Sequence, residues 1–514
     1  MDYSINFTTL FVLVPVLAFV LLKNWKKKSR SISANLLPSP KELPIIGHLH
    51  LMTSLPFRSL RDLAKQYGPI MRLKLGEVPA IVVSSPEIAK EMLKERDPNF
   101  ADKPGSIAMK IMWYNYVNIS FSPYGDYWKQ MRRICIQELL SPKNVRSFSS
   151  IRKDEVSHLV EWIHLSAGKP INLSEKIISM SSSVMSRAAF GKVCKDIDAL
   201  IELLNKGTKL AGGFEMGDFF PSTKIINSFS WSKMRMVKMR RNVDVIFDGI
   251  IDEHRENLEK MSRENGEMPG RKGNGEFGNE DLVDVLLRLK ESGELQFPIG
   301  NDNIKAVLYD MFGAGSETSS TTIDWTMTEL MRNPRVMAKA QAEVREVFEG
   351  KNRIIDENEL HKLKYLKLVI KEALRLHPAA AVIPRASREE CEINGYRIPA
   401  KIKIVINNWA IQRDPKYWTN PESFEPERFE SNSMDFAASD FKYIPFGAGR
   451  RICPGITFGL AGVELSLAQL LYGFNWRLPD GIKPEDLDMT ENPGISTPRR
   501  DHLYVVACPN QSLA

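Results

Sequence analysis

The chain has 514 residues, of which 43% are hydrophobic and 26% are charged, and its formal net charge is +7. This composition is typical of a packed globular protein, and so small a charge excess argues against a nucleic-acid-binding protein. Five cysteines are scattered without paired spacing, which argues against a disulfide framework and favours a reducing compartment.

The first thirty residues combine an apolar run with a cationic end. Residues 7–22 carry no charge, and five basic residues follow between Lys23 and Arg30. A cleaved signal peptide has its positive charge before the apolar run, so the reversed order favours a retained membrane anchor. The run is slightly shorter than the ~20 residues that cross a bilayer, but snorkelling lysines lengthen such a span. We interpret residues 1–30 as a signal-anchor with a cytosolic positive flank; the alternative is a buried amino-terminal helix.

A proline-rich segment separates this anchor from the rest of the chain. Pro38, Pro40 and Pro44 lie within residues 31–47, which predicts a stiff, extended hinge. No comparable break occurs in residues 48–514, where only residues 262–282 have the composition of a surface loop. Helical periodicity in residues 333–350 and 365–378, with short β-prone runs in 70–85 and 396–411, predicts one mainly α domain with a small β portion.

Cys453 lies in the sequence FGAGRRICPG, residues 446–455. Arg450, Arg451 and a Pro-Gly turn surround it, so positive charge and backbone N–H groups favour its thiolate. A lone cysteine cannot complete a tetrahedral zinc site, whereas haem iron needs one axial ligand on this face. Glycines allow a flat macrocycle to approach the backbone, and Phe446 is placed to pack against it. The alternative is a structural thiol in a glycine-rich loop.

The loop has the pattern Phe-x-x-Gly-x-Arg-x-Cys-x-Gly and resembles the haem-thiolate loop of the cytochrome P450 family. Further stretches resemble motifs of the same family: KEALR at 371–375, PERF at 426–429, AGSETS at 314–319, WKQMR at 128–132 and the proline hinge. The chain looks like plant microsomal members that oxidise terpenoids, alkaloids and phenolics. The resemblance implies the cytochrome P450 fold over residues 48–514, preceded by one N-terminal transmembrane helix, with haem b bound through Cys453.

The resemblance also gives roles to the motif residues. Glu372, Arg375 and Arg428 form a buried ion network that fixes the cysteine loop; without it, Glu372 and Arg375 would be an exposed pair three residues apart. The residues implied in haem binding are Trp128, Arg132, Arg385, Phe446, Arg451 and Gly455, with Trp128 and the three arginines facing the propionates.

An acid–alcohol pair, Glu317 and Thr318, is implied on the oxygen side of the haem, where the two side chains supply protons. Gly313 and Gly315 weaken the helix there and predict a local opening. The alternative is a Ser/Thr-rich helix whose hydroxyl groups bond its own carbonyls.

These features predict a monooxygenase anchored in the endoplasmic reticulum membrane by a single span, with a cytosolic catalytic domain. No dinucleotide fingerprint and no flavin-sized second domain occur, so electrons come from NADPH through a separate NADPH-cytochrome P450 reductase. Its docking face is expected at Lys129, Arg133, Lys442 and Arg450. The alternatives are a haem-thiolate isomerase or dehydratase, a haem sensor, or a flavonoid or phenolic hydroxylase.

The substrate is expected to be a terpenoid-derived indole alkaloid or a terpenoid, and the pocket is expected to be largely apolar. By resemblance its lining is Ile107, Met109, Met112, Asp310, Phe312, Ala314, Val382, Ile383 and Ile495. Asp310, Glu215 and Asp218 would pair with a protonated amine. Alternatively, Asp310 bonds the backbone of a neighbouring segment and the other two acids face water.

Overall fold

The structure, a computed structural model, describes residues 37–212, 216–222, 231–265, 280–350, 354–430 and 434–510. The predicted membrane anchor, residues 1–30, lies outside these ranges, as do Glu215 and most of the predicted surface loop 262–282. Residues 37–47 of the predicted hinge lie beside the first strand, where the N–H of Arg72 donates to the carbonyl of Pro38 over 2.8 Å.

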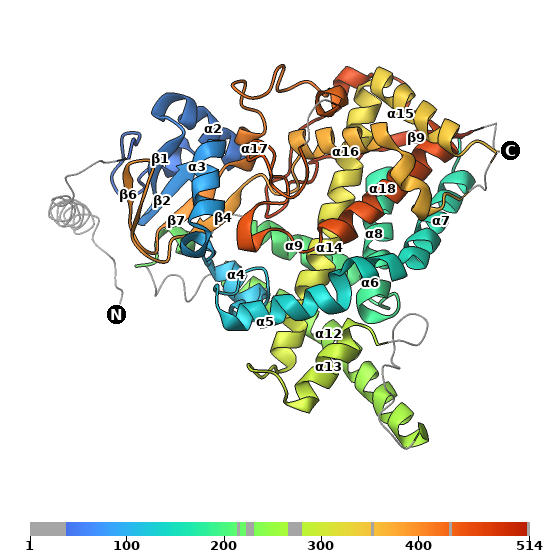
Figure 1. Cartoon of the computed structure of the whole chain (residues 1–514), viewed down its shortest axis with the longest axis horizontal. Helices are drawn as coiled ribbons and strands as arrows, with labels where there is room; N and C mark the ends of the chain where they lie inside the picture. The colour runs from blue at the N-terminus through green and yellow to red at the C-terminus, as the bar shows by residue number, and fades with distance from the viewer. Residues whose placement is uncertain are drawn as a thin grey trace, which may run out of the picture.

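Helices make up most of the described chain, and the sheets lie mainly at one side of the helical part (Figure 1). The expected mainly α class with a small β portion is therefore confirmed. The principal helices are α2 (Pro56–Tyr67), α5 (Asp126–Cys135), α7 (Ser149–Leu165), α8 (Leu173–Phe190), α9 (Ile197–Gly212), α12 (Trp231–Asn265), α13 (Leu282–Ser292), α14 (Asn301–Arg332), α15 (Pro334–Val347), α16 (Lys364–Leu376) and α18 (Ile456–Gly473). Shorter ones are α3 (Pro86–Lys90), α4 (Ile107–Met112), α6 (Pro142–Ser147), α10 (Met216–Phe219) and α17 (Asn408–Ile411).

The largest sheet has the strand order β1-β2-β7-β4, with bounds Ile70–Leu75, Val78–Val83, Lys403–Ile406 and Ile383–Ala386. β2 and β7 are parallel, and the other two pairs are antiparallel. The β1–β2 turn contains Gly76 at a φ of +63°, where a Cβ would lie 2.6 Å from the Phe219 carbonyl oxygen. The smaller sheets are β3-β9-β8 (Pro170–Asn172, Tyr504–Pro509, Phe474–Arg477) and β5-β6 (Cys391–Ile393, Tyr396–Ile398).

Helix α14 passes through the middle of the helical part in Figure 1 and packs against α8 and α18. Most of its 32 residues are buried, as expected for a helix that is apolar or small on nearly every face. Ala314 and Thr318 are exceptions, because both are exposed although they lie one turn apart near the helix centre. An open space therefore adjoins this part of α14.

Helix α18 is the one helix in the described ranges that is long and apolar enough to cross a membrane. More than half of its residues are buried, and it packs against α7, α14 and α15. These contacts make α18 a core helix of the domain, so it gives no evidence about the predicted anchor.

Candidate functional site

The loop of residues 446–455 places Cys453 directly before α18. The N–H of Cys453 donates to the carbonyl of Phe446 over 3.0 Å, which closes the loop. Gly449 has a φ of +71°, and a Cβ there would clash with the carbonyl oxygen of Leu93. The loop therefore requires glycine at this position, both for its left-handed backbone and for its close approach to the neighbouring segment.

The electrostatics of Cys453 differ from the sequence interpretation. Burial raises the pKa of the thiol, and the Gly455 N–H and the charges of Arg132 and Lys103 only partly oppose this. The guanidinium groups of the two arginines that precede Cys453 in the sequence bind other partners. Arg450 pairs with Asp97 over 3.3 Å, and Arg451 donates to the carbonyls of Ala101 and Ser122. The protein alone therefore favours the thiol, and a coordinated metal ion is what would ionise it.

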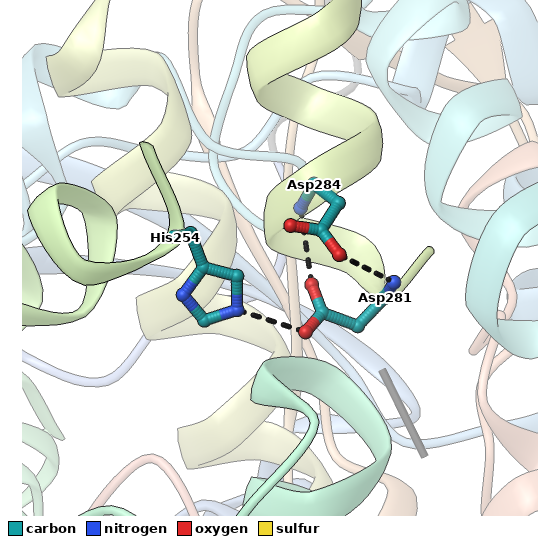
Figure 2. Close-up of side chains that lie close together, drawn as sticks. All are labelled: His254, Asp281 and Asp284. Carbon is teal, nitrogen blue, oxygen red and sulfur yellow. Dashed lines mark hydrogen bonds and ion pairs between the residues drawn. The ribbon is translucent and has the colours of Figure 1, made fainter. Parts of the chain in front are cut away.

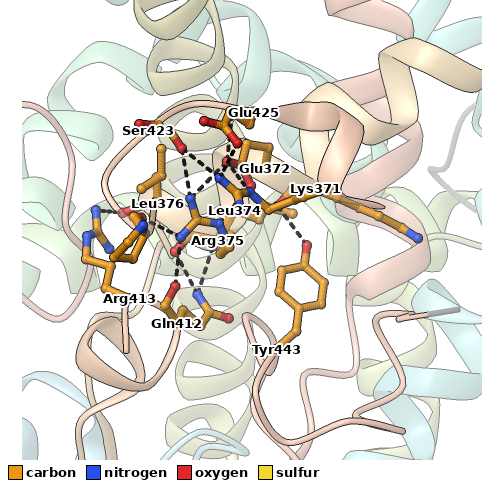
Figure 3. Close-up of polar contacts among 12 residues, drawn as sticks. Lys371, Glu372, Leu374, Arg375, Leu376, Gln412, Arg413, Ser423, Glu425 and Tyr443 are labelled. Carbon is orange, nitrogen blue, oxygen red and sulfur yellow. Dashed lines mark hydrogen bonds and ion pairs between the residues drawn. The ribbon is translucent and has the colours of Figure 1, made fainter. Parts of the chain in front are cut away.

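Glu372 and Arg375 of α16 form the buried centre of an ion network (Figure 3). Arg375 Nε lies 2.7 Å from Glu372 Oε2 and Nη2 lies 2.8 Å from Oε1, while Arg428 Nε lies 3.0 Å from Oε1. Neither the Glu372 nor the Arg375 side chain is exposed to solvent. The alternative of an exposed surface pair is therefore wrong.

Gln412 connects the network to the cysteine loop. Its Nε2 donates to the carbonyls of Leu374 and Arg375, and its Oε1 accepts the N–H of Ile444 over 3.1 Å. Next to it, the hydroxyl of Tyr443 donates to the carbonyl of Lys371 over 3.0 Å. Helix α16 thus holds residues 443 and 444, which immediately precede the loop.

Helix α14 contacts the start of α18 at Ser319, the residue after Thr318. A Cβ at Gly459 of α18 would lie 3.5 Å from the hydroxyl of Ser319. Thr318 Oγ1 donates to the carbonyl of Ala314 over 2.8 Å, and α14 runs unbroken from Asn301 to Arg332. The expected local opening of the helix is therefore wrong, and Gly315 is explained instead by Met185, whose methyl group occupies the place of a Cβ.

Comparisons with known proteins identify this arrangement. The family model described as cytochrome P450 matches residues 37–506. The chain belongs to the cytochrome P450 family. Premnaspirodiene oxygenase of Hyoscyamus muticus is 52% identical over 507 residues, covering 98% of this chain and 99% of the relative. Tabersonine 3-oxygenase of Catharanthus roseus is 50% identical over 503 residues, covering 97% and 96% respectively.

A further relative, 5-epiaristolochene 1,3-dihydroxylase of Nicotiana tabacum, is 51% identical over 509 residues and covers 98% of this chain and 99% of its own length. A solved zebra fish cytochrome P450 has the same fold, with a TM-score of 0.73 at 24% identity over 89% of this chain and 100% of that one. This protein is accordingly a cytochrome P450 monooxygenase, a haem-thiolate enzyme of a family that takes NADPH electrons through a reductase.

The cationic residues near the cysteine loop of this cytochrome P450 suit a dianionic group. Arg385 is buried and its Nε has no hydrogen-bond partner in the described part of the chain. Burial lowers its pKa to about 10, and burial together with the charge of Arg385 lowers the pKa of Arg451 to about 9. Two neighbouring guanidinium groups that repel each other and form no ion pair with a described carboxylate fit the propionates of haem.

Lys103 belongs to the same cluster and was not expected from the sequence. Burial and repulsion by Arg385 and Arg451 lower its pKa to about 7, and Cys453 also acts on it. It precedes α4, whereas Arg385 lies in β4 and Arg451 in the cysteine loop. A single lysine before a proline carries no sequence signal for this role, because the cluster forms only when three distant segments meet.

Two other residues expected at the haem contact the surrounding backbone. Trp128 Nε1 donates to the carbonyl of Ile119 over 2.9 Å, and Arg132 Nη2 donates to the carbonyl of Ile452 over 2.6 Å. The guanidinium of Arg451 lies 4.3 Å from the Trp128 ring centre. Helix α5 is thereby fixed to the cysteine loop.

Asp310 was expected to line the substrate pocket, but it is buried and hydrogen-bonded to a neighbouring segment. Its Oδ1 accepts the side chain of Asn118 over 2.8 Å, and its Oδ2 accepts the N–H groups of Ile119 and Ser120, each over 2.9 Å. The alternative of a bond to a neighbouring backbone segment is thus correct. Asp218 is similarly engaged, because its Oδ1 accepts the N–H of Ile107 over 2.8 Å.

Three apolar residues expected in the pocket lie in the core instead. Met112 and Phe312 are completely buried, and the Phe312 ring stacks on Phe190 with centres 5.8 Å apart. Ile383 is 7% exposed and packs among the strands of the largest sheet. Periodicity places such residues on a helix or strand but does not say which face meets a cavity. The other expected lining residues are at least partly exposed: Ile107, Met109, Ala314, Val382 and Ile495.

A buried group of His254, Asp281 and Asp284 has the composition of a metal site (Figure 2). His254 Nδ1 faces the Ile250 carbonyl and Nε2 faces Asp281 Oδ2, each at 2.8 Å, so both nitrogens must donate and the ring is charged. Burial lowers the pKa of His254, but the hydrogen bond and charge of Asp281 outweigh it and the net pKa is raised.

The two aspartates form the cap of α13. Asp281 Oδ1 accepts the N–H groups of Val283 and Asp284, and Asp284 Oδ2 accepts the N–H of Asp281. A charged imidazole has no lone pair for a metal. His254, Asp281 and Asp284 therefore join α12 to the start of α13 by hydrogen bonds and do not form a metal centre.

Proposed function

We propose that this monooxygenase oxidises a neutral, largely apolar terpenoid, with a terpenoid-derived indole alkaloid as the second candidate. Two relatives that are 52% and 51% identical are named for the oxidation of premnaspirodiene and 5-epiaristolochene. The neutral class is favoured because Asp310 and Asp218 are hydrogen-bonded to backbone N–H groups, which leaves neither as a ready partner for a protonated amine. The alkaloid class is kept because tabersonine 3-oxygenase is 50% identical.

The observation that carries the proposed site is the cluster of Lys103, Arg385 and Arg451 near Cys453, in which no member forms an ion pair with a described carboxylate. We propose that the Cys453 thiolate would hold the haem iron and that Trp128, Arg132, Arg385 and Arg451, joined by Lys103, would hold the propionates. Phe446 and Gly455 would lie against the ring. When bound, haem supplies the one-electron and oxygen chemistry that the side chains of the chain lack.

The roles proposed for the chain's own residues are positional. Glu372, Arg375 and Arg428 hold the loop that contains Cys453. Thr318 and Glu317, which lie on α14, hold and move protons. Thr318 is exposed beside Ala314, so its hydroxyl is accessible from the open space next to α14. Its present bond to the Ala314 carbonyl must be exchanged when the hydroxyl donates elsewhere.

Residues 1–30 are proposed to anchor the protein in the endoplasmic reticulum membrane, and residues 31–47 to form the hinge before a cytosolic catalytic domain. Lys129, Lys442 and Arg450 of the proposed reductase face each have an acidic partner on this chain, so docking would exchange ion pairs rather than create them. The glycosylation sequon at Asn172 tests the orientation. A cytosolic domain leaves it bare, and a glycan there in the native cell would overturn the orientation.

The substrate proposal is tested by product analysis of the full-length protein in lipid with a plant NADPH-cytochrome P450 reductase. Neutral terpenoids, indole alkaloids and flavonoids are compared, each with and without NADPH. We expect NADPH-dependent oxidation of a terpenoid. Turnover of an alkaloid alone would select the second candidate, turnover of a flavonoid alone would select the phenolic hydroxylase, and product without NADPH would select an isomerase or dehydratase.

A further inference from the structure

Residues 491–499 form a loop that closes on itself. Its first and last residues, Glu491 and Arg499, lie opposite each other as an antiparallel bridge, and the next pair inward shares a backbone hydrogen bond of 2.7 Å. Ile495, which is expected to line the substrate pocket, is the middle residue of this loop. It is partly exposed, whereas the two residues that follow it are buried.

The far end of the loop is held by three other parts of the chain. The carbonyl of Thr497 accepts the indole N–H of Trp325 over 2.9 Å, and the Thr497 hydroxyl donates to the carbonyl of Pro378 over 2.7 Å. The loop also meets the end of α9, where a Cβ on Gly212 would lie 2.1 Å from the carbonyl carbon of Gly494. The backbone on both sides of the middle residue is therefore fixed.

Glu491 holds the opposite end of the loop. Its side chain is 3% exposed, and its Oε2 accepts a bond from Nη2 of Arg58 over 2.5 Å. Its Oε1 accepts the indole N–H of Trp409 over 3.1 Å. Arg58 lies in α2 and Trp409 lies in α17, so one buried carboxylate joins the loop to two helices. Neither of these helices carries a residue that is expected to line the pocket.

Trp409 extends this contact to a second part of the expected pocket wall. Its backbone N–H donates to the carbonyl of Ala381 over 2.9 Å. Its ring belongs to the apolar cluster against which Val382 packs, and Val382 is another expected lining residue. Glu491 is thus joined to Val382 through one indole side chain and to Ile495 through the loop.

We propose that Glu491 is a positioning residue that sets where Ile495 and Val382 lie relative to each other, and thereby how the substrate is oriented. The inference rests on the proposed substrate pocket. A carboxylate suits this position because both of its partners are donors, and the charged Arg58 strengthens one of the two bonds. An amide in either orientation turns its own N–H₂ group toward a donor, so Glu491→Gln keeps the size of the side chain and loses a contact.

The test compares Glu491→Gln with Glu357→Gln in the full-length haem protein. Glu357 is the matched control, because it also accepts bonds from a buried arginine, Arg152, over 2.6 and 2.9 Å. No expected lining residue lies in either of the two segments that this pair joins. Trp409→Phe is a second, milder variant that removes the indole N–H and keeps an aromatic ring. If Glu491 acts through this bond, combining Glu491→Gln with Trp409→Phe should have little more effect than the stronger single change.

The first readout does not depend on the identity of the substrate. Imidazole and 1-phenylimidazole both bind haem iron through a ring nitrogen, but only the phenyl group reaches the surrounding wall. Glu491→Gln should weaken the binding of 1-phenylimidazole about three-fold relative to imidazole, because a wall that shifts slightly loses much of its dispersion contact with the ring. Glu357→Gln should leave the ratio of the two dissociation constants unchanged, even where it lowers the melting temperature.

The second readout is the distribution of products from the terpenoid that the product analysis selects. The ratio of the main product to the others should fall about ten-fold in Glu491→Gln, and total turnover should change less, because a small displacement of a positioning wall misorients the substrate. Glu357→Gln should keep the wild-type distribution.

An unchanged ratio of dissociation constants in both Glu491→Gln and Trp409→Phe would overturn the inference. An equal change of that ratio in Glu357→Gln would also overturn it, because the effect would then follow from lost stability alone. Failure of the wild-type protein to oxidise any terpenoid would instead overturn the proposed function, and the comparison of the two imidazoles would still decide the role of Glu491.

Discussion

Replacing Glu372 with glutamine keeps the shape of the side chain and removes its charge. Oε1 of Glu372 accepts bonds from Arg375, Arg428 and the N–H of Glu425, and Oε2 accepts a bond from Arg375. Every one of these partners is a donor, so an amide nitrogen in either orientation meets a donor. The substitution also leaves the completely buried Arg375 without its compensating charge.

The expected cost follows from these contacts. Removing one partner of a buried ion pair destabilises a protein by about 3–5 kcal/mol. The domain matched by the family model spans residues 37–506. At about 2.1 cal/mol/K of unfolding entropy per residue, a domain of that length has about 1 kcal/mol/K, so Glu372→Gln should lower the melting temperature by about 3–5 °C.

A surface pair of the same spacing provides the control. Arg255 and Asp252 of α12 are also three residues apart and lie 2.9 Å from each other, but their side chains are 36% and 61% exposed. Asp252→Asn should cost less than about 1 kcal/mol and shift the melting temperature by less than about 1 °C. Thermal unfolding of the full-length haem proteins in the same lipid compares the two variants.

Loss of haem absorbance with time gives a second assay. Because the network holds residues 443 and 444 before the cysteine loop, Glu372→Gln should release haem faster than the wild type, and Asp252→Asn should not. If the two variants melt together within about a degree and lose haem at the same rate, the reasoning from burial is refuted.

Three further substitutions test separate features. Cys453→Ser should abolish the thiolate-type absorption of the reduced carbon monoxide complex, and its persistence would show that the ligand lies elsewhere. Thr318→Ala should retain haem but divert electrons into hydrogen peroxide, measured per NADPH consumed; an unchanged product yield makes Thr318 purely structural. His254→Gln removes a cation that stabilises the folded protein by pairing with Asp281. This stabilisation is fully present below the free histidine pKa of ~6.5 and is lost as the pH rises through the raised pKa of His254 in the folded protein. Its deficit in melting temperature should therefore be larger at pH ~6 than at pH ~9, and a deficit independent of pH contradicts the charged form.

Local spacing explains which parts of the site were predictable. Glu372 and Arg375 lie three residues apart on one helix, and the glycines around Cys453 lie in the same short loop, so the sequence alone brings these residues together. The mainly α class with a small β portion follows similarly from periodicity within single segments. These predictions need no knowledge of how distant elements pack.

Contacts between distant segments explain the rest. Lys103 joins Arg385 and Arg451 from three separate segments, and nothing in its own neighbourhood distinguishes it from a surface lysine. The helical pattern of α14 places Asp310 on a face but gives no distance to residues 118–120, about 190 positions earlier in the chain. From the sequence, Gly315 is a residue that destabilises its helix. The structure shows instead that the side chain of Met185 on α8 leaves no room for a Cβ at this position.

The number and kind of donors decide how two buried acids on α14 differ. Asp310 and Glu317 lie about two turns apart, and burial raises the pKa of both. Asp310 fills both oxygens with bonds from residues 118–120, two of them from backbone N–H groups that cannot turn away, so it fixes a loop. Glu317 accepts the hydroxyl group of Ser496 on one oxygen, whereas the Thr208 hydroxyl lies 3.4 Å from that oxygen and closer, at 3.1 Å, to the carbonyl of Asn205. A hydroxyl group can rotate away from its acceptor. A change in the protonation of Glu317 would therefore disturb fewer contacts than the same change at Asp310, which joins α14 to the segment before α5.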